Sequence, residues 1–284
     1  MKTPKRLLPL VEEGMIDEVL RQLMSGKEAT VYVVRCGEEI RCAKVYKEAS
    51  QRSFKQAAAY QEGRNVKNSR QARAMQKGSK YGRKMQEEVW QNAEVDALYK
   101  LAAAGVRVPK PYICFEGVLL MDLIGDGQGD VAPRLNDVAL DADTARTYFH
   151  QLLHQVVLML GAGIVHGDLS EFNILLDADG PVIIDLPQAI NAAGNMGAES
   201  MLIRDVDNLT QYFSQFAPEL SGTQYGKEIW QLYAASLLSP ETPLTGKVAA
   251  PTKMVDLDAV IEEIELVRQE AEDRALYLAT RNEK

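Results

Sequence analysis

An acid and an amide in this chain stand at a spacing that suits phosphoryl transfer. Asp168 precedes Asn173 by five residues, and a second acid, Asp185, follows twelve residues later. A carboxylate can orient a hydroxyl group and take its proton, and carboxylate and amide oxygens are the ligands that Mg²⁺ prefers. We therefore expect Asp168 to be the catalytic base, and Asn173 and Asp185 to hold the metal.

The residues between the two metal ligands predict how those ligands meet. Residues 174–176 have the composition of a strand, 177–180 that of a turn, and 181–184 that of a returning strand. Such a hairpin brings Asp185 back beside Asn173, so that two hard oxygen ligands converge on one cation. The Asp-to-Asn spacing is also that of a kinase catalytic loop, which favours function over a group of solvated acids.

A lysine lies in a stretch that alternates like a half-buried strand. Lys44 stands among Ile40, Ala43 and Val45, and a buried lysine needs an anion to remain charged. ATP phosphates and a helix carboxylate would satisfy it, so we expect Lys44 to be catalytic. A helix is predicted over residues 87–103, with Glu94 as the partner of Lys44 and Glu87 and Glu88 as competitors for that place.

A turn upstream of Lys44 has small and charged residues suited to covering a phosphate. It runs from Ser25 through Lys27 and Glu28 to Thr30, and residues 31–34 follow as a strand. It holds one glycine, so it is neither a Walker A loop nor a GxGxxG loop. Taken alone, a plain hairpin turn is the better interpretation.

The composition places the chain among ordinary soluble proteins. Of 284 residues, 46% are hydrophobic and 25% charged, and no apolar run approaches the length needed to cross a bilayer. Residues 1–6 lack the apolar core of a signal peptide. We therefore expect no membrane partner. The three cysteines form no CxxC pair, which favours a reducing cytoplasm.

Charge is distributed unevenly. Residues 52–86 contain ten Lys or Arg and one acid, which leaves 22 basic and 39 acidic residues elsewhere, a charge of −17. A basic segment on an acidic body suggests an anionic partner such as RNA, although a solvated insertion explains it equally well. A flexible loop is expected there.

Two lobes are expected to meet near residue 123. Strands are predicted at 113–115 and 117–121, and the glycine-rich stretch 125–129 marks a boundary. This gives an N-lobe over 1–123 and a C-lobe over 124–284. In the second lobe we expect a helix over 143–160, a helix that begins near Arg204 with Asp205 as its cap, and a terminal helix over about 257–271.

His150 and His154 lie one turn apart on the first of these helices, a spacing that permits a zinc pair. No third ligand accompanies them, so surface or packing roles are the better interpretation.

Taken together, the motifs resemble the RIO family of atypical serine kinases and ATPases, over about residues 14–215. They are Ser25–Tyr32, Ala43–Tyr46, Ala132–Leu135, His166–Asn173 and Ile184–Gln188. The resemblance implies an α+β, two-lobed, protein-kinase-like fold with a β-rich N-lobe and a helical C-lobe, trimmed of the activation loop and the peptide-binding subdomains. Most motifs look like the branch without an N-terminal winged helix, whereas Pro187 is closer to the other branch, so a divergent member is expected.

The resemblance also implies a role for each matching residue. Asp168 would be the catalytic Asp, Lys44 would pair with Glu94 and the ATP phosphates, and Asn173 and Asp185 would hold Mg²⁺, or Mn²⁺ in its place. The phosphate turn would be lined by Ser25, Lys27 and Glu28, and the adenine would lie at residues Met121 to Ile124. The basic segment 52–86 matches a loop that carries autophosphorylated serines, with Ser69 and Ser79 as candidates.

We therefore expect an ATP- and Mg²⁺-dependent serine protein kinase or ATPase that acts on an unidentified protein or on itself, with an RNA or ribosomal partner at the basic loop. Two alternatives remain. One is a small-molecule phosphotransferase of the aminoglycoside type, against which the Ser25 turn and the basic segment argue. The other is a nucleotide-sensing module on a ribonucleoprotein with little turnover, against which the complete set of site residues argues.

Overall fold

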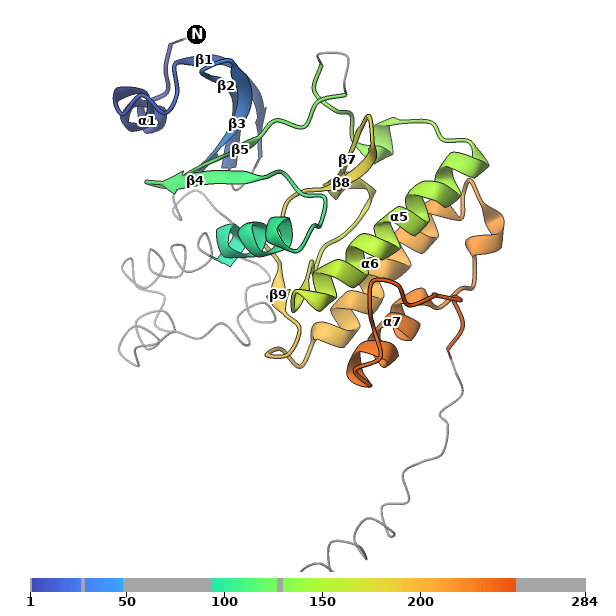
Figure 1. The fold of residues 1–284 in the computed structure, drawn as a ribbon. Helices are drawn as coiled ribbons and strands as arrows, with labels where there is room; N and C mark the ends of the chain where they lie inside the picture. The colour runs from blue at the N-terminus through green and yellow to red at the C-terminus, as the bar shows by residue number, and fades with distance from the viewer. Residues whose placement is uncertain (1, 27–28, 48–92, 127–129, 249–284) are drawn as a thin grey trace, which may run out of the picture. The chain divides into compact units, whose positions relative to one another are not determined.

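The computed structural model describes residues 2–26, 29–47, 93–126 and 130–248 (Figure 1). Several sequence predictions fall outside these ranges: Lys27, Glu28, the basic segment 52–86 with Ser69 and Ser79, Glu87, Glu88 and the terminal helix over 257–271. The described residues up to 247 belong to one compact unit. The predicted lobe boundary near residue 123 stays a prediction.

An antiparallel sheet of five strands forms the first part of the chain, in the order β1-β2-β3-β5-β4. A 3₁₀ turn and a short helix α1 precede it. Residues 7–23, whose apolar residues follow neither a clear helical nor a clear strand period, contribute to both α1 and β1. The bounds are α1 Leu8–Glu12, β1 Glu18–Ser25, β2 Ala29–Cys36, β3 Glu39–Tyr46, β4 Pro111–Phe115 and β5 Val118–Asp122.

Strand alternation decides which way Lys44 points. Ala43 and Val45 belong to a small core that also contains Leu7 and Leu10. Because successive side chains of a strand point to opposite faces, Lys44 lies on the other face of β3. Tyr46 shares that face and belongs to the larger core of the molecule.

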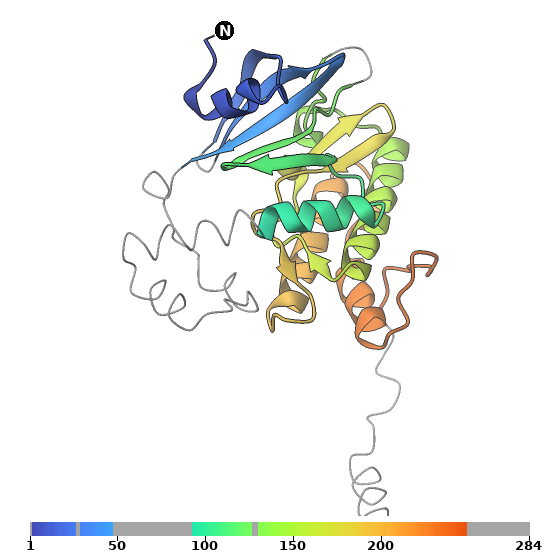
Figure 2. The same ribbon diagram turned by 60° about the vertical axis from the view of Figure 1, so that its left-hand side comes forward.

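The predicted helix after the basic segment is present, and the structure describes it over residues 93–103. It lies next to β4 in both views of the ribbon, where it is drawn in teal (Figures 1 and 2). Its residues Leu98 and Leu101 are buried in the larger core. The helix therefore places Glu94 beside the sheet face that carries Lys44.

Helices and two small two-stranded sheets form the rest of the described chain, so the predicted α+β class with a β-rich first part and a helical second part is confirmed. The two-stranded pairs are β6-β9 and β7-β8. No helix in the described ranges is long and apolar enough to span a membrane. The bounds are α5 Ala142–Gly161, β6 Ile164–Val165, β7 Ile174–Asp177, β8 Gly180–Ile183, β9 Ile190–Asn191, α6 Ala198–Phe213 and α7 Tyr225–Ala234.

Helix α5 matches its prediction to within a residue at each end. Asp141 caps it, because its side chain accepts hydrogen bonds from the backbone N–H groups of Asp143 (2.9 Å) and Thr144 (2.8 Å). Phe149, Leu152 and Leu160 on its inner face are fully buried. The helix is therefore fixed at its start by a cap and along its length by packing.

The prediction for α6 was wrong. The helix begins at Ala198, and Asp205 lies in its middle rather than at its cap. Gly197 precedes the helix and offers no side-chain cap, so the start carried no sequence signal. Leu202 and Leu209, spaced around Asp205 at helical intervals, are buried with it, because the inward face runs through all three positions.

Candidate active site

Lys44 joins two acids from distant parts of the chain. Its Nζ lies 2.5 Å from Oε1 of Glu94 and 3.1 Å from Oδ1 of Asp185. Lys44 is 9% exposed and Glu94 5%, whereas the Asp185 side chain is half exposed. The predicted pairing of Lys44 with Glu94 is thus seen in the structure, and Asp185 shares the same cation.

The charges of this cluster support one another. Burial opposes the charged form of Lys44, but the Glu94 and Asp185 carboxylates outweigh it and raise the pKa of Lys44 well above its usual value. Burial likewise acts to raise the pKa of Asp185, yet Lys44, His166 and Arg134 lower it overall. Both groups are therefore charged at neutral pH.

The hairpin β7-β8 brings Asn173 and Asp185 together as predicted. Ile174 pairs with Ile183, and the Ile184 N–H donates to the Asn173 carbonyl oxygen at 2.9 Å. Asp185 adopts a φ of 66°, a left-handed conformation that is uncommon for a residue other than glycine and is found at functional sites.

The donor groups at this point suit a hard cation. Asn173 uses its Nδ2 to donate to the Asp168 carbonyl oxygen (2.8 Å), so its Oδ1 is left available to a cation. The ionised carboxylate of Asp185 offers oxygens of the same hard type. In the described ranges, no group of three or more His, Cys, Asp or Glu that could hold a metal ion occurs.

A buried acid holds the loop that carries Asp168. Asp205, 2% exposed, accepts hydrogen bonds from the backbone N–H groups of Gly167 (2.7 Å) and Leu169 (3.0 Å). From the same helix, Arg204 donates to the Gly167 carbonyl oxygen and Asn208 to that of Leu169 (3.1 Å). Helix α6 thus fixes the backbone on both sides of Asp168.

Sequence reasoning missed this role of Asp205, although a signal was present. An acid on the apolar face of an amphipathic helix has to find hydrogen-bond donors inside the protein. Burial raises the pKa of Asp205 to about 7, although the two backbone hydrogen bonds and Arg204 act to lower it.

His166 is a second buried group at the loop. Its Nδ1 accepts from the Asp168 N–H (3.3 Å), so Nε2 carries the proton and faces the Ile184 carbonyl oxygen at 3.2 Å. Burial lowers the pKa of His166 to about 4, so the ring is neutral at physiological pH. The ring links the catalytic loop to the residue that precedes Asp185.

The Asp168 side chain is exposed. Partial burial and the charge of Asp185 raise its pKa, and Arg204 opposes them. Gln188 Nε2 donates to Asp168 Oδ2 at 3.0 Å. A carboxylate in this setting can orient a hydroxyl group and take its proton.

The residues predicted to contact the nucleotide lie on the sheet. Ser25 is the last residue of β1. Lys47 Nζ donates hydrogen bonds to Ser25 Oγ (3.1 Å) and to the Gly26 carbonyl oxygen (2.6 Å). Sequence reasoning did not identify Lys47 as a residue of this turn. Met121 lies on β5 next to β3, and Ile124 follows that strand. Nucleotide contacts of Ser25, Met121 and Ile124 stay predictions.

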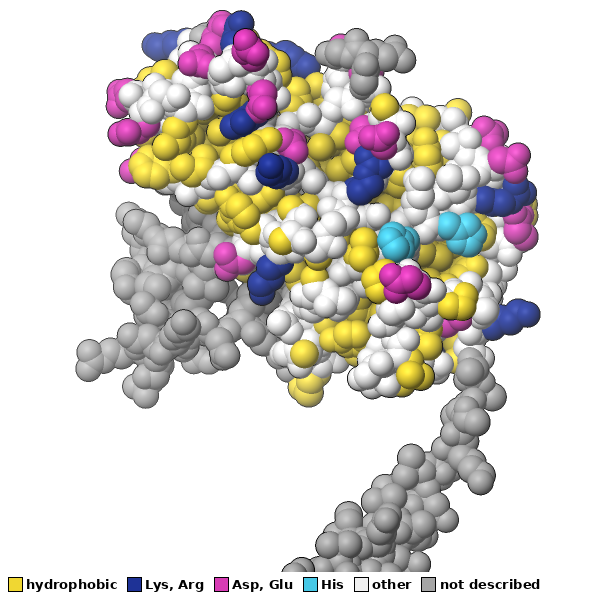
Figure 3. All heavy atoms as spheres, viewed as in Figure 1, with side chains coloured by type: hydrophobic (Ala, Val, Ile, Leu, Met, Phe, Trp, Pro, Cys, Tyr) yellow, Lys and Arg dark blue, Asp and Glu magenta, His cyan; other side chains and the backbone are white. Residues whose placement is uncertain are grey.

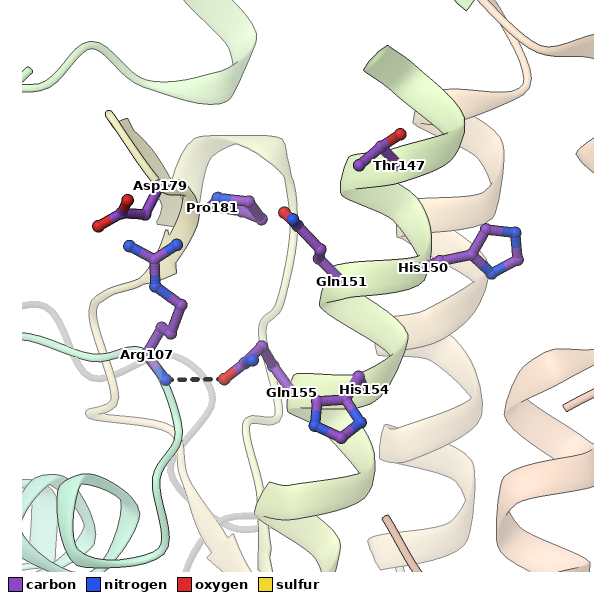
Figure 4. A pocket seen from close by; sticks show the side chains of 8 residues that line it. All are labelled: Arg107, Thr147, His150, Gln151, His154, Gln155, Asp179 and Pro181. Carbon is purple, nitrogen blue, oxygen red and sulfur yellow. Dashed lines mark hydrogen bonds between the residues drawn. The ribbon is translucent and has the colours of Figure 1, made fainter. Parts of the chain in front are cut away.

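A groove of about 540 Å³ lies between α5 and the β7-β8 turn (Figure 4). In Figure 4, Gln151 and Gln155 extend from α5 toward Arg107, and His150 points away. His150 and His154 are exposed, and two histidines are visible on this face in Figure 3. The His150 ring also packs edge-on against Phe149 and Tyr225, at centroid distances of 5.7 and 6.3 Å, so this histidine has a packing role.

Comparison with known proteins agrees with this geometry. A family model described as the RIO domain matches residues 30–225. The RIO-type serine/threonine-protein kinase Rio1 of Haloferax volcanii is 31% identical over 214 residues, which cover 75% of this chain and 69% of that protein. Its counterpart in Methanocaldococcus jannaschii is 32% identical over 213 residues, 75% of this chain and 68% of that protein.

A human relative matches a smaller share of its own length. The serine/threonine-protein kinase RIO1 of Homo sapiens is 32% identical over 214 residues, 75% of this chain but 36% of that protein. The residues matched by the RIO-domain model include Lys44, Asp168 and Asp185. The chain belongs to the RIO family of serine/threonine-protein kinases.

Proposed function

We propose that the chain transfers the γ-phosphoryl group of ATP to a hydroxyl group in a Mg²⁺-dependent reaction, as a serine protein kinase with an ATPase activity. The observation that carries the proposal is the position of Lys44, whose Nζ lies 2.5 Å from Glu94 and 3.1 Å from Asp185. A cation held at this point by two acids can receive ATP phosphates without moving far. The second acid remains half exposed toward a metal.

Different residues would bind the phosphates, the metal ion and the adenine of ATP. Lys44 would contact the phosphates and Glu94 would hold Lys44 in place, while Asp185 and Asn173 would bind Mg²⁺. Mn²⁺, which takes the same oxygen ligands, is the alternative ion. Bound Mg²⁺ neutralises charge that develops on the phosphate oxygens. The adenine would lie at Met121–Ile124.

Asp168 would act on the acceptor. Its carboxylate accepts the proton of the attacking hydroxyl group as the phosphorus–oxygen bond to ADP breaks. The backbone of its loop is held by Asp205 through hydrogen bonds of 2.7 and 3.0 Å, so the base is fixed before ATP arrives. The acceptor would be a protein serine or the chain itself at Ser69 or Ser79.

The basic segment 52–86 would bind RNA or a ribosomal partner, on the strength of its ten Lys or Arg and one acid. If four of these side chains meet phosphates, log affinity falls with log salt at a slope of roughly −3, at about −0.7 per single-strand contact. Deletion of residues 60–82 should flatten this slope and spare ATP binding. Equal slopes for the two proteins would contradict an RNA partner at this segment.

We also propose a cytoplasmic location, because the three cysteines form no disulfide.

The proposal is tested by incubating the chain with γ-labelled ATP and Mg²⁺, alone and with a protein or a small alcohol. Label on protein supports the kinase, and label on inorganic phosphate supports the ATPase. Label on the alcohol alone would replace the protein acceptor with a small molecule. Asp168→Ala should remove transfer, and Asp179→Ala, a change at an exposed acid of the β7-β8 turn, should not. Absence of label from every product would contradict the proposal.

A further inference from the structure

The side-chain amide of Gln188 contacts the carboxylate that we propose as the catalytic base. Its Nε2 donates to Oδ2 of Asp168 at 3.0 Å. An amide that faces a carboxylate presents its NH₂ group, because an ionised carboxylate accepts hydrogen bonds and donates none. The contact joins residues 20 positions apart in the chain, so the fold has to bring them together.

The backbone under Gln188 is held firmly. Leu186 is 2% exposed and Ala189 6%, and the Ala189 N–H donates to the Leu186 carbonyl oxygen at 3.1 Å. This tight turn leaves Gln188 half-buried, whereas Asp168 is exposed. The Gln188 side chain thus extends to Asp168 from a backbone that is packed on both sides.

We propose that Gln188 is a positioning residue that holds Asp168 by its Oδ2 and presents Oδ1 to the acceptor hydroxyl group. The inference rests on the proposed function. Within the described ranges, no donor contacts Oδ1. A carboxylate fixed at one oxygen keeps its plane, so the second oxygen stays in the position that the hydroxyl proton must reach.

The proton and the electrons balance in this arrangement. The acceptor oxygen forms a bond to the γ-phosphorus, the bond from that phosphorus to the bridging oxygen breaks, and ADP leaves with its electron pair. The hydroxyl proton moves to Asp168 Oδ1 while Gln188 stays bound to Oδ2. Gln188 exchanges no proton, and its contribution is the orientation of Asp168.

The charges around Asp168 leave a role for a neutral donor. Arg204 and Asp205 face it from α6, Asp185 from the segment after β8, and His166 from its own loop. Arg204 favours the ionised carboxylate, and the charge of Asp185 opposes it. His166 is neutral at physiological pH. A hydrogen bond from Gln188 favours the ionised form without adding a charge that would attract the ATP phosphates.

Turnover tests the inference with two variants and a control. In Gln188→Ala, kcat should fall about tenfold with KM for ATP unchanged, since a positioned base contributes on the order of 10²-fold or more and only part of its positioning is lost. Gln188→Glu keeps the shape but adds a like charge, so kcat should fall further. Gln211→Ala, at an exposed position of α6, should leave both constants unchanged.

A second readout does not depend on activity. Crystal structures of the wild type and of Gln188→Ala should show the Asp168 carboxylate in one orientation in the wild type and in more than one in the variant. A carboxylate with the same single orientation in both proteins would overturn the inference. A wild type in which Gln188 contacts Asp168 but no phosphoryl group is transferred would overturn the proposed function instead, so the two failures are distinguishable.

Discussion

Lys44 and Asp168 differ in their burial and in the contacts that fix their positions. Lys44 is 9% exposed and has a carboxylate on either side, at 2.5 and 3.1 Å. Asp168 is exposed, and its loop is held by backbone hydrogen bonds to the buried Asp205, at 2.7 and 3.0 Å. In the first region, ion pairs to two carboxylates fix the Lys44 side chain. In the second region, the buried Asp205 fixes the backbone of the loop, and the Asp168 side chain remains exposed.

The difference suits two tasks. The position of the Lys44 side chain would change little if an ATP phosphate replaced one of its two carboxylate partners, because the other carboxylate would still hold it. The binding of a phosphate requires such a fixed cation. An exposed base on a fixed backbone can meet a large acceptor while its position stays constant. Substitutions in the first region should therefore affect nucleotide binding and stability, and those in the second should affect turnover.

The largest effect is expected at Asp168. Asp168→Ala should reduce phosphoryl transfer on the order of 10²–10⁴-fold and leave ATP affinity nearly unchanged, because a positioned base is lost and the phosphate contacts remain. Rate measurements at saturating ATP, together with a binding titration, check both parts. Wild-type turnover in this variant would remove Asp168 from the mechanism.

Next in size is the loss of Glu94. Glu94→Ala leaves Lys44 buried beside Asp185 alone and should destabilise the fold by about 3 kcal/mol, measured by denaturant unfolding. Lys44→Met combined with Glu94→Leu should recover most of this loss, since two apolar side chains need no partner. Asp96→Ala, at an exposed acid of the same helix, is the control. A double variant as unstable as the single one would contradict the account of the ion pair.

The pH dependence of stability should reveal Asp205 and His166 as opposing groups. Burial raises the pKa of Asp205 to about 7 from 3.8, so its contribution to stability is present below pH 4 and is lost as the pH rises toward 7. Burial lowers the pKa of His166 to about 4 from 6.5, so its contribution is present above pH 6.5 and is lost as the pH falls toward 4. The two slopes offset each other in the wild type.

Single substitutions should separate these slopes. In Asp205→Asn, the free energy of unfolding should rise with pH between about 4 and 6.5, because His166 remains. In His166→Gln it should fall with rising pH over about 4 to 7. Parallel pH profiles for the two variants, from denaturant unfolding at several pH values, would contradict these assignments.

The smallest effect is expected at the start of α5, which belongs to neither the Lys44 region nor the Asp168 region. Asp141→Ala removes the cap of α5 and should lower the melting temperature by a few degrees at most, with turnover unchanged. Asp141→Asn, which retains an acceptor oxygen, should keep the melting temperature close to that of the wild type. A loss of activity beyond the loss of folded protein would connect this helix end to the site.

The sequence was sufficient where local pattern decides the structure. Alternation on β3 predicts a half-buried Lys44, and the turn residues between β7 and β8 predict the hairpin that returns Asp185 to Asn173. Helix α5 carries both a cap and a periodic apolar face. These features depend on residues close together in the chain.

It was insufficient where long-range contacts decide a residue's role. An aspartate that caps a helix and one buried inside a helix are the same letter, and only the start of α6 at Ala198 distinguishes them. The contacts of Gln188 with Asp168 and of Lys47 with Gly26 each join residues about 20 positions apart. No periodicity or spacing indicates such pairs.

The division of tasks between the two regions is tested most directly by the affinity for ATP with and without Mg²⁺, measured calorimetrically for the wild type, Asp185→Asn and Asp168→Asn. The account predicts that Asp185→Asn loses most of the Mg²⁺-dependent part of the affinity, since the carboxylate proposed as the main metal ligand is gone, and that Asp168→Asn retains it. Equal losses in the two variants, or no Mg²⁺ dependence in the wild type, would contradict it.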